Sequence, residues 1–418
     1  MLSEFANGFK VTELRNRVIF TLVMFCFFRL GAHIPVPGVN AEVIEQLFNS
    51  GSLFGMLDMF SGGALSKFSI FAMSITPYIN ASIILQLLKA VVPTLDQWSK
   101  EGEEGFKKIN KLTRQFTVVL CFVQAYGMAY GLRMAINNPG IASMLMIALT
   151  LTAGTMLLMW IGEQMTAKGL GNGISLIIFA GIVSRLPDGL KVIYEYLNAG
   201  TVNLVNVILF AVLALAIIIF VIMITEGIRK IPIQYAKRIV GHKSYGGSSS
   251  YLPMKINQAN VIPVIFASSV LMFPATIAQF VNVPAVRNFA EYLRWGSPLQ
   301  TTLYVLLIIF FTFFYTAVMM NIKDLSENLK KNGGFIPGIR PGQPTADYLD
   351  GVMSRITMAG AIFLAIIALT PNVVAGITHI EGIYFGGTAL LIVVAVALDT
   401  LKQAESMVIM RHYHGFMK

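Results

Sequence analysis

Long apolar runs separated by short polar stretches recur along the whole chain. The hydrocarbon core of a bilayer is about 30 Å thick and a helix rises about 1.5 Å per residue, so roughly 20 mostly apolar residues are needed to cross it. Runs of that kind predict ten membrane-spanning helices, at residues 18–36, 68–92, 115–136, 144–166, 174–193, 203–225, 260–281, 302–322, 356–375 and 383–400. The pattern therefore predicts an all-α polytopic membrane protein.

One apolar segment between the first two runs is too short to cross the membrane. It covers residues 53–65, and Gly55, Gly62 and Gly63 interrupt it. Irregular backbone at membrane depth persists only inside protein or beside water. The segment is therefore either a re-entrant plug that fills a cavity from outside or an amphipathic loop on the outer surface.

The second and seventh runs repeat one pattern, in which a proline precedes a helix dotted with alanine and serine. "ITPYINASIIL" and "VIPVIFASSVL" match at Pro77 and Pro263, Ile79 and Ile265, Ala81 and Ala267, Ser82 and Ser268, and Leu85 and Leu271. We interpret this as two five-span halves, residues 1–200 and 201–418. Because five is odd, the halves would have inverted topology, as in many transporters and channels. Chance similarity of two proline-bearing helices is the alternative.

Composition and charge agree with a membrane protein and orient it. The chain is 56% hydrophobic and 12% charged, whereas a soluble domain carries roughly 25% charged residues. Most of its 31 lysines and arginines fall on the side of the membrane that carries the N-terminus. The positive-inside rule therefore predicts that both termini, and the long loops at 226–260 and 323–355, are cytoplasmic. In the first loop, two β-prone stretches flank a turn-rich "GHKSYGGSSS" and predict a hairpin.

The spans contain little reactive chemistry. Arg29 is the one charge well inside a predicted span, whereas ion-coupled transporters place ionisable residues near the midplane. The five histidines form no HExxH motif, and no phosphate-binding lysine loop is present. The sequence therefore predicts neither an enzyme nor a cofactor or metal site. An ion-coupled small-molecule transporter remains the alternative function, because ten spans with an inverted repeat suit it as well.

Branched isoleucines recur at helical spacing in two of the spans. Ile75 and Ile79 are four residues apart, as are Ile174 and Ile178, so each pair lies on one helix face. Such pairs are typical of core packing. If they line a passage, they form an apolar constriction that gates by dewetting and needs no charge.

Seven stretches in order make the chain resemble the SecY family, the central channel subunits of the bacterial protein-conducting translocon. The stretches are "RLGAHIPVPG", "GGALSKFSIFAMSITPYINASIILQLL", "GLGNGISLIIFAGIV", "IPIQYAKR", "VIPVIFASS", "FIPGIRPGQPTADYLD" and "YFGGTALLIVV". The tail "RHYHGFMK" is similar to that of relatives from Bacillus. Asn260 departs from the family, which has glycine just before "VIP".

The resemblance implies a clamshell of two halves around an hourglass pore. Its waist would be a ring of apolar side chains, at Ile75, Ile79, Ile174, Ile178, Ile265 and Ile392. The resemblance also favours the plug, which would consist of Leu53, Phe54, Gly55, Met56, Leu57, Met59, Phe60, Gly62 and Gly63.

The same resemblance implies a lateral gate between the second and seventh spans, through which signal sequences and membrane segments reach lipid. Small residues would let the helices approach closely and the prolines would let them bend. The implied gate residues are Pro77, Ala81, Ser82, Pro263, Ala267, Ser268 and Ser269.

The implied partners are SecE, SecG, the SecA ATPase, the ribosome through its RNA, and the signal sequences of preproteins, in a bacterial plasma membrane. Basic residues of the cytoplasmic loops would form the docking surface for the motor and the ribosome, at Arg340, Arg229, Lys230, Lys237 and Arg238.

Overall fold

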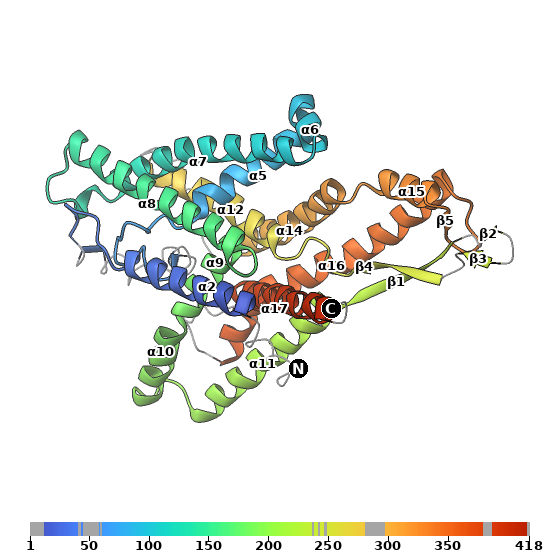
Figure 1. The fold of residues 1–418 in the computed structure, drawn as a ribbon. Coiled ribbons are helices and arrows are strands. Elements are labelled where there is room, and N and C mark those ends of the chain that lie inside the picture. Colours follow the sequence, from blue (N-terminus) through green and yellow to red (C-terminus); the bar gives the residue numbers. More distant parts are fainter. Residues whose placement is uncertain are drawn as a thin grey trace.

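The computed structural model describes residues 12–40, 43–44, 58, 61–235, 238–240, 243–245, 249–280, 297–378 and 387–415. Most of these residues are helical (Figure 1). The helices are α2 (Thr12–Gly31), α5 (Thr76–Val91), α6 (Pro93–Lys100), α7 (Glu103–Gly131), the short η1 (Arg133–Ala135), α8 (Ile141–Lys168), α9 (Gly173–Ser184), α10 (Leu186–Asn198), α11 (Leu204–Glu226), α12 (Ile262–Phe280), α14 (Pro298–Met319), α15 (Ile322–Lys331), α16 (Gln343–Thr378) and α17 (Gly387–Gly415).

Each apolar run predicted from the sequence contains a helix, but several boundaries differ. Helices α7, α16 and α17 continue for many residues beyond their apolar runs, into polar sequence. Hydropathy detects only the part of a helix that is apolar, so these extensions were missed. By length and composition, α8, α11, α16 and the α14–α15 segment could each cross a membrane, and the sharply bent pair α5 and α6 adds a fifth candidate among the described residues.

Two predicted spans are broken. The second was predicted from residue 68, but α5 begins at Thr76, because Phe68 and Ser74 have positive φ angles of 44° and 50° that no α-helix accommodates. The fifth is divided at Arg185 into α9 and α10, and Pro187 lies in the first turn of α10. Proline is tolerated there because the first turn needs no N–H donor.

The described helices form two sets with the same internal contacts. In the first set, α2 packs on α8 and α9, and the chain α5, α7, α8, α9 packs in consecutive pairs. In the second set, α11 packs on α16 and α17, and α12, α14, α16, α17 pack in consecutive pairs. When the five helices of each set are numbered in chain order, the same pairs of numbers are in contact in both sets.

The first two helices of each set are the exception to the rule that consecutive elements pack together. Residues 62–75, directly before α5, are non-helical, and a β-hairpin separates α11 from α12. The sets meet mainly through equivalent members, because α9 packs on α17 and α5 touches α12. The shared contact pattern is a second, independent sign of the repeat seen in the sequence.

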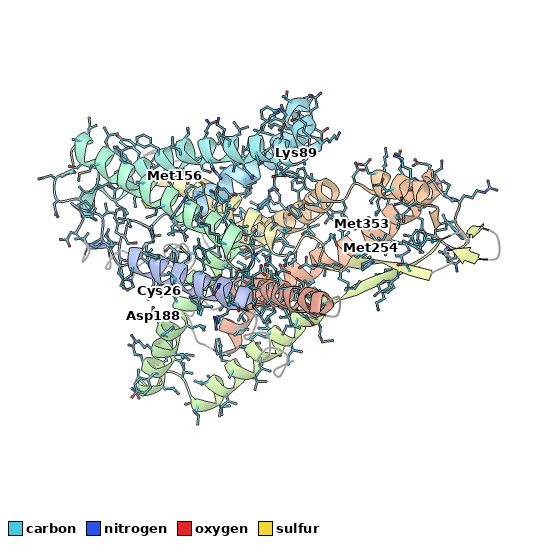
Figure 2. All side chains as sticks on the ribbon, in the orientation of Figure 1. Cys26, Lys89, Met156, Asp188, Met254 and Met353 are labelled. Atoms are coloured by element: carbon cyan, nitrogen blue, oxygen red, sulfur yellow. The ribbon has the colours of Figure 1, made fainter. Side chains whose placement is uncertain are left out.

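The predicted hairpin is present and is anchored to the bundle. Strand β1 (Ile228–Tyr235) pairs antiparallel with β4 (Ser249–Lys255), and β5 (Gly334–Phe335) adds to the other edge of β1. Beyond them, β2 (Arg238–Val240) pairs with β3 (Lys243–Tyr245). The buried side chain of Met254 packs beside Met353 of α16, where the hairpin projects beyond the helices (Figure 2). The hairpin is therefore fixed at its base on the extension of α16.

Close packing around the irregular segment before α5 generates a test of the fold. A Cβ built on Gly154 of α8 would lie 1.9 Å from the carbonyl oxygen of Ile70, whereas one on Gly351 of α16 meets nothing within 4 Å. We expect Gly154→Ala to lower the free energy of unfolding in detergent by about 1–3 kcal/mol. Gly351→Ala is the control and should raise it by up to about 1 kcal/mol. Equal effects of the two substitutions would contradict this packing.

Candidate functional site: an isoleucine cluster between the helix sets

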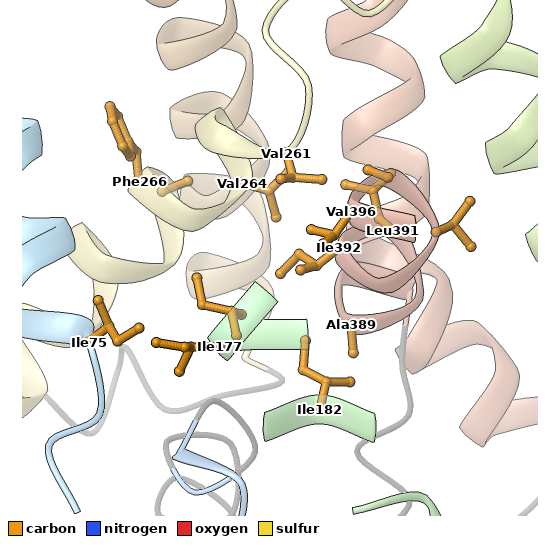
Figure 3. Packing of buried hydrophobic residues seen from close by; sticks show 14 of the residues in the cluster. Ile75, Ile177, Ile182, Val261, Val264, Phe266, Ala389, Leu391, Ile392 and Val396 are labelled. Carbon is orange, nitrogen blue, oxygen red and sulfur yellow. The ribbon is translucent and has the colours of Figure 1, made fainter. Parts of the chain in front are cut away.

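The six isoleucines singled out in the sequence gather in one apolar cluster, which we call the isoleucine cluster. Ile75, Ile178 and Ile392 are buried in its core, and Ile79, Ile174 and Ile265 are partly buried against it. Ile75 is the N-cap residue of α5, and the other five lie on α5, α9, α12 and α17, which are the second and fifth helices of each set. Figure 3 shows Ile75, Ile177 and Ile392 among the packed side chains.

Half of the six side chains are buried in this structure. Ile75, Ile178 and Ile392 are 1%, 6% and 1% exposed, so these three line no open passage, whereas the other three are partly exposed. Burying such side chains stabilises the packed arrangement by roughly 1.5–3 kcal/mol each. The cluster is therefore an apolar contact between the two helix sets.

The glycine-rich turn "GLGNG" places α9 in the cluster. A Cβ on Gly173 would lie 2.0 Å from the carbonyl oxygen of Gly162 in α8, so only glycine permits this approach. Gly171, with φ of +80°, brings the turn against Thr400 of α17. The Asn172 side chain accepts hydrogen bonds from the backbone N–H groups of residues 174 and 175 and caps the helix. This sequence therefore presses α9 against both neighbours.

Asn260, where the sequence departs from the family pattern, lies at the entrance to α12. Its φ is 54°, in the left-handed region that glycine adopts freely and asparagine tolerates better than other residues. Its side-chain nitrogen donates a hydrogen bond of 3.0 Å to Oδ2 of Asp399 in α17. Asparagine therefore keeps the glycine-type backbone and adds a tie between two helices of the cluster.

The proposed gate residues lie on α5 and α12, which touch each other. Ala81 and Ala267 are completely buried, as close helix packing requires. Ser268 donates to the carbonyl oxygen of Ile265 in its own helix, and Ser82 accepts from Gln86. Ser269 is partly buried.

The expectation that the two gate prolines let their helices bend by removing backbone hydrogen bonds is wrong. Pro77 and Pro263 lie in the first turns of α5 and α12, where the missing N–H breaks no helical hydrogen bond. They start the helices and do not kink them. The apolar pattern alone does not show where a helix begins, because apolar residues lie on both sides of each proline. It therefore does not distinguish a proline at the start of a helix from one in its middle.

The outer turn, which we define as Asp58 and residues 61–66, overlaps the second half of the predicted plug segment. Residues 53–57, 59 and 60 of the plug lie outside the described residues. Gly62 and Gly63 have φ angles of +66° and +85°, which explains the two glycines. Arg29 of α2 donates a hydrogen bond of 2.9 Å to the carbonyl oxygen of Gly62, so it is paired with the turn.

Strands β1, β2 and β5, which carry or adjoin the described docking residues, lie away from α5 and α9, on the right of Figure 1. Arg340 is exposed between Gly338 and Gly342, which have φ angles of +83° and +106°, and its carbonyl oxygen accepts a 2.8 Å hydrogen bond from Thr345. Arg229 and Lys230 are exposed on β1. The backbone of residue 238 belongs to β2, and residue 237 lies outside the described residues.

One pair of residues was missed by the sequence interpretation. Asp58 is 1% exposed and forms an ion pair with Arg185 at the break between α9 and α10. Arg185 was noted only as an irregularity at the end of a span. The sequence did contain a signal for this pair. An acidic residue lies in an apolar segment and a basic residue lies in another predicted span, and charges at membrane depth are expected to pair.

The long apolar helices define a class: a polytopic helical membrane protein. Within that class, the chain belongs to the SecY family, whose model matches residues 69–401. Members of this family are the channel subunits of protein translocases, and the ion-coupled transporter considered from the sequence is not supported.

Relatives and solved structures agree with this assignment. The chain is 49% identical to the protein translocase subunit SecY of Halalkalibacterium halodurans and 47% identical to that of Bacillus subtilis, with all of each chain covered. It is 44% identical to the Escherichia coli K12 subunit, over 97% of this chain and 94% of the relative.

A solved structure described as a protein conducting channel has a TM-score of 0.63 at 17% identity, covering 94% of this chain and 92% of the other. Sec61 in the canine ribosome-channel complex has a TM-score of 0.61 at 16% identity, with the same coverage. The fold is therefore that of these channels.

Proposed function

We propose that unfolded preproteins cross the bacterial plasma membrane through the isoleucine cluster, which is the waist of the pore. The observation that carries the proposal is the convergence of six isoleucines, from the second and fifth helices of both sets, in one apolar cluster. A ring of branched side chains fits around many different peptides. It also leaves no polar path for ions, because an apolar constriction excludes water.

The two halves are residues 1–200 and 201–418, with inverted topology and both termini in the cytoplasm. Their equivalent internal contacts support this division. Signal sequences and membrane segments leave for lipid between α5 and α12, which touch each other and each carry a fully buried alanine, Ala81 and Ala267. That seam opens more readily than the α9 and α17 contact, which the glycine-rich turn holds tightly.

Partners supply the force and the support. The SecA motor and the ribosome dock on the exposed basic residues of the cytoplasmic loops, with Arg340 held at the tip of the second loop. SecE and SecG cover part of the apolar surface, which is extensive on α11. The proposal for the ribosome is supported by the likeness to a channel solved in a ribosome complex.

The direct test is a crosslink inside the waist. In a background with Cys26 and Cys121 replaced, Ile178→Cys should form a disulfide with a cysteine in a secretory chain stalled midway through membrane vesicles. The crosslink should require both a functional signal sequence and active translocation. If a matched cysteine at position 340 reacts while the one at 178 never does, the chain docks without entering and the proposal is wrong.

Polarity at the waist should break the seal. Ile392→Asn buries an amide without a partner, at a cost of about 1–3 kcal/mol to the closed state. We expect the ion leak of proteoliposomes, and transport of preproteins with weakened signal sequences, to rise about tenfold. Ile392→Leu keeps the site apolar and should behave as the wild type. An unchanged leak in the asparagine variant would argue against the waist.

Reversing the charge of Arg340 should impair the docking of partners without changing the ion leak through the closed channel. Arg340→Glu places a negative charge on the exposed loop tip, so we expect SecA-driven transport to fall by at least about threefold. The resting ion leak should be unchanged because Arg340 lies apart from the isoleucine cluster. Lys111→Glu, at an exposed position of α7 outside both docking loops, is the matched control. Equal losses in the two variants would show a general charge effect and no specific docking role.

A further inference from the structure

Helix α10 separates its polar residues from its apolar ones. The polar face consists of Asp188, Lys191, Glu195 and Asn198. The opposite, apolar face consists of residues that recur at helical spacing, Leu186, Leu190, Ile193, Tyr194 and Leu197. None of the 13 residues of α10 is buried, and Leu190 and Tyr194 are 66% and 65% exposed. The rest of the chain therefore covers the apolar face only in part.

The start of α10 lies level with the C-terminal end of α2. The carbonyl oxygen of Gly62 accepts hydrogen bonds from Arg29 of α2 at 2.9 Å and from Ser184, the last residue of α9, at 3.3 Å. Helix α2 has 20 residues and is about 30 Å long, which matches the thickness of the hydrocarbon core. Because the N-terminus of α2 is cytoplasmic in the proposed topology, α10 begins at the outer boundary of that core.

The length and direction of α10 suit the surface of the bilayer better than its interior. Its 13 residues span about 20 Å, too short to cross the hydrocarbon core. Figure 1 shows α10 leaving the end of α9 and running across the direction of α2. An amphipathic helix placed in this way lies in the plane of the interface, with its apolar face toward the acyl chains.

The helix that follows indicates what covers this face. Helix α11 is long and apolar enough to cross a membrane, and only Val221 in it is buried. Its exposed apolar surface begins in its first turn, where Leu204 and Val205 are 64% and 71% exposed. At least part of such a surface lies in lipid. The apolar face of α10 precedes it by a short turn, so the same bilayer can cover both.

The charges of α10 indicate how it meets lipid. Two acidic residues and one basic residue lie on its polar face, so anionic headgroups gain little from contact with it. The apolar face instead carries Tyr194, and tyrosine is enriched where an apolar ring and a polar hydroxyl meet the two sides of an interface. Contact with lipid therefore depends on apolar burial and not on charge.

We propose that α10 is an interfacial helix, which lies along the outer surface of the bilayer with Leu190 and Tyr194 at the boundary between headgroups and acyl chains. The partner of this face is the lipid surface itself. The proposal rests on the proposed function only for its topology, which names the leaflet. The run at 174–193, predicted from the sequence to be one span, then ends its membrane crossing at Arg185.

The test uses the full chain with its partner subunits in vesicles of phosphatidylcholine. In a background without Cys26, Cys121 or cysteines in the partners, a nitroxide label is placed at Leu190→Cys or Tyr194→Cys. The matched controls are Lys191→Cys and Glu195→Cys, each one residue along the chain but on the polar face. Collisions of the label with oxygen, which concentrates in lipid, are compared with collisions with a water-soluble nickel chelate.

We expect oxygen to dominate at 190 and 194 and the nickel chelate to dominate at 191 and 195, so that the ratio of the two differs by about fivefold or more between neighbours. Adding anionic phosphatidylglycerol should change each ratio by less than about twofold, because the contact is apolar. If one labelled variant fails to accumulate, the other pair of neighbours gives the same comparison.

Three results would overturn the interfacial helix. Access of the nickel chelate to 190 and 194 would show that the apolar face is in water. Low collision with both reagents at these positions would show that protein covers it. Oxygen contact that appears only with anionic lipid would show attachment by charge. The measurement needs no transport and detects lipid in either leaflet, so failure of the proposed function would leave its result unchanged.

Discussion

Inside a bilayer, every backbone polar group must find its partner within the protein, and the irregular segment before α5 is where this constraint is hardest to meet. The segment pairs with the end of α2 through the backbone N–H of Val36 to the carbonyl of Phe68, at 3.0 Å, and that of Ile70 to the carbonyl of Ile34, at 3.0 Å. Helix α8 covers it so closely that Gly154 has no room for a side chain. The surrounding helices are therefore arranged around a non-helical core.

That arrangement explains why the first two helices of the first set do not pack together. The space between them is filled by the irregular segment, and α2 packs on α8 and α9 instead. In the second set the corresponding connection is the hairpin, which leaves the bundle and packs on the extension of α16. The equivalent connections of the two sets thus differ: one packs among the helices, and the other extends beyond them and carries exposed basic residues.

The sequence predicted the apolar runs, the hairpin and four of the isoleucines, because each depends on local periodicity and composition, whereas Ile265 and Ile392 were named from the family resemblance. It did not predict where helices break. Phe68 and Ser74 adopt positive φ angles that neither residue type favours, so tertiary contacts must impose them. It also did not predict pairs such as Asn260 with Asp399, or Asp58 with Arg185, whose members are far apart in the chain. The two gate prolines were expected to let their helices bend, but both lie in the first turn, where a proline breaks no helical hydrogen bond.

Two kinds of interaction hold neighbouring parts of this region in different ways. The isoleucine cluster is held by apolar contacts, which are non-directional. The outer turn is tied to the junction of α9 and α10 by the ion pair of Asp58 with Arg185, in which Asp58 is 1% exposed. A buried charge that loses its partner is costly, so this pair specifies one position of the turn more sharply than apolar contact does. In the proposed function, the charges that fix the turn therefore stay outside the apolar cluster that excludes water.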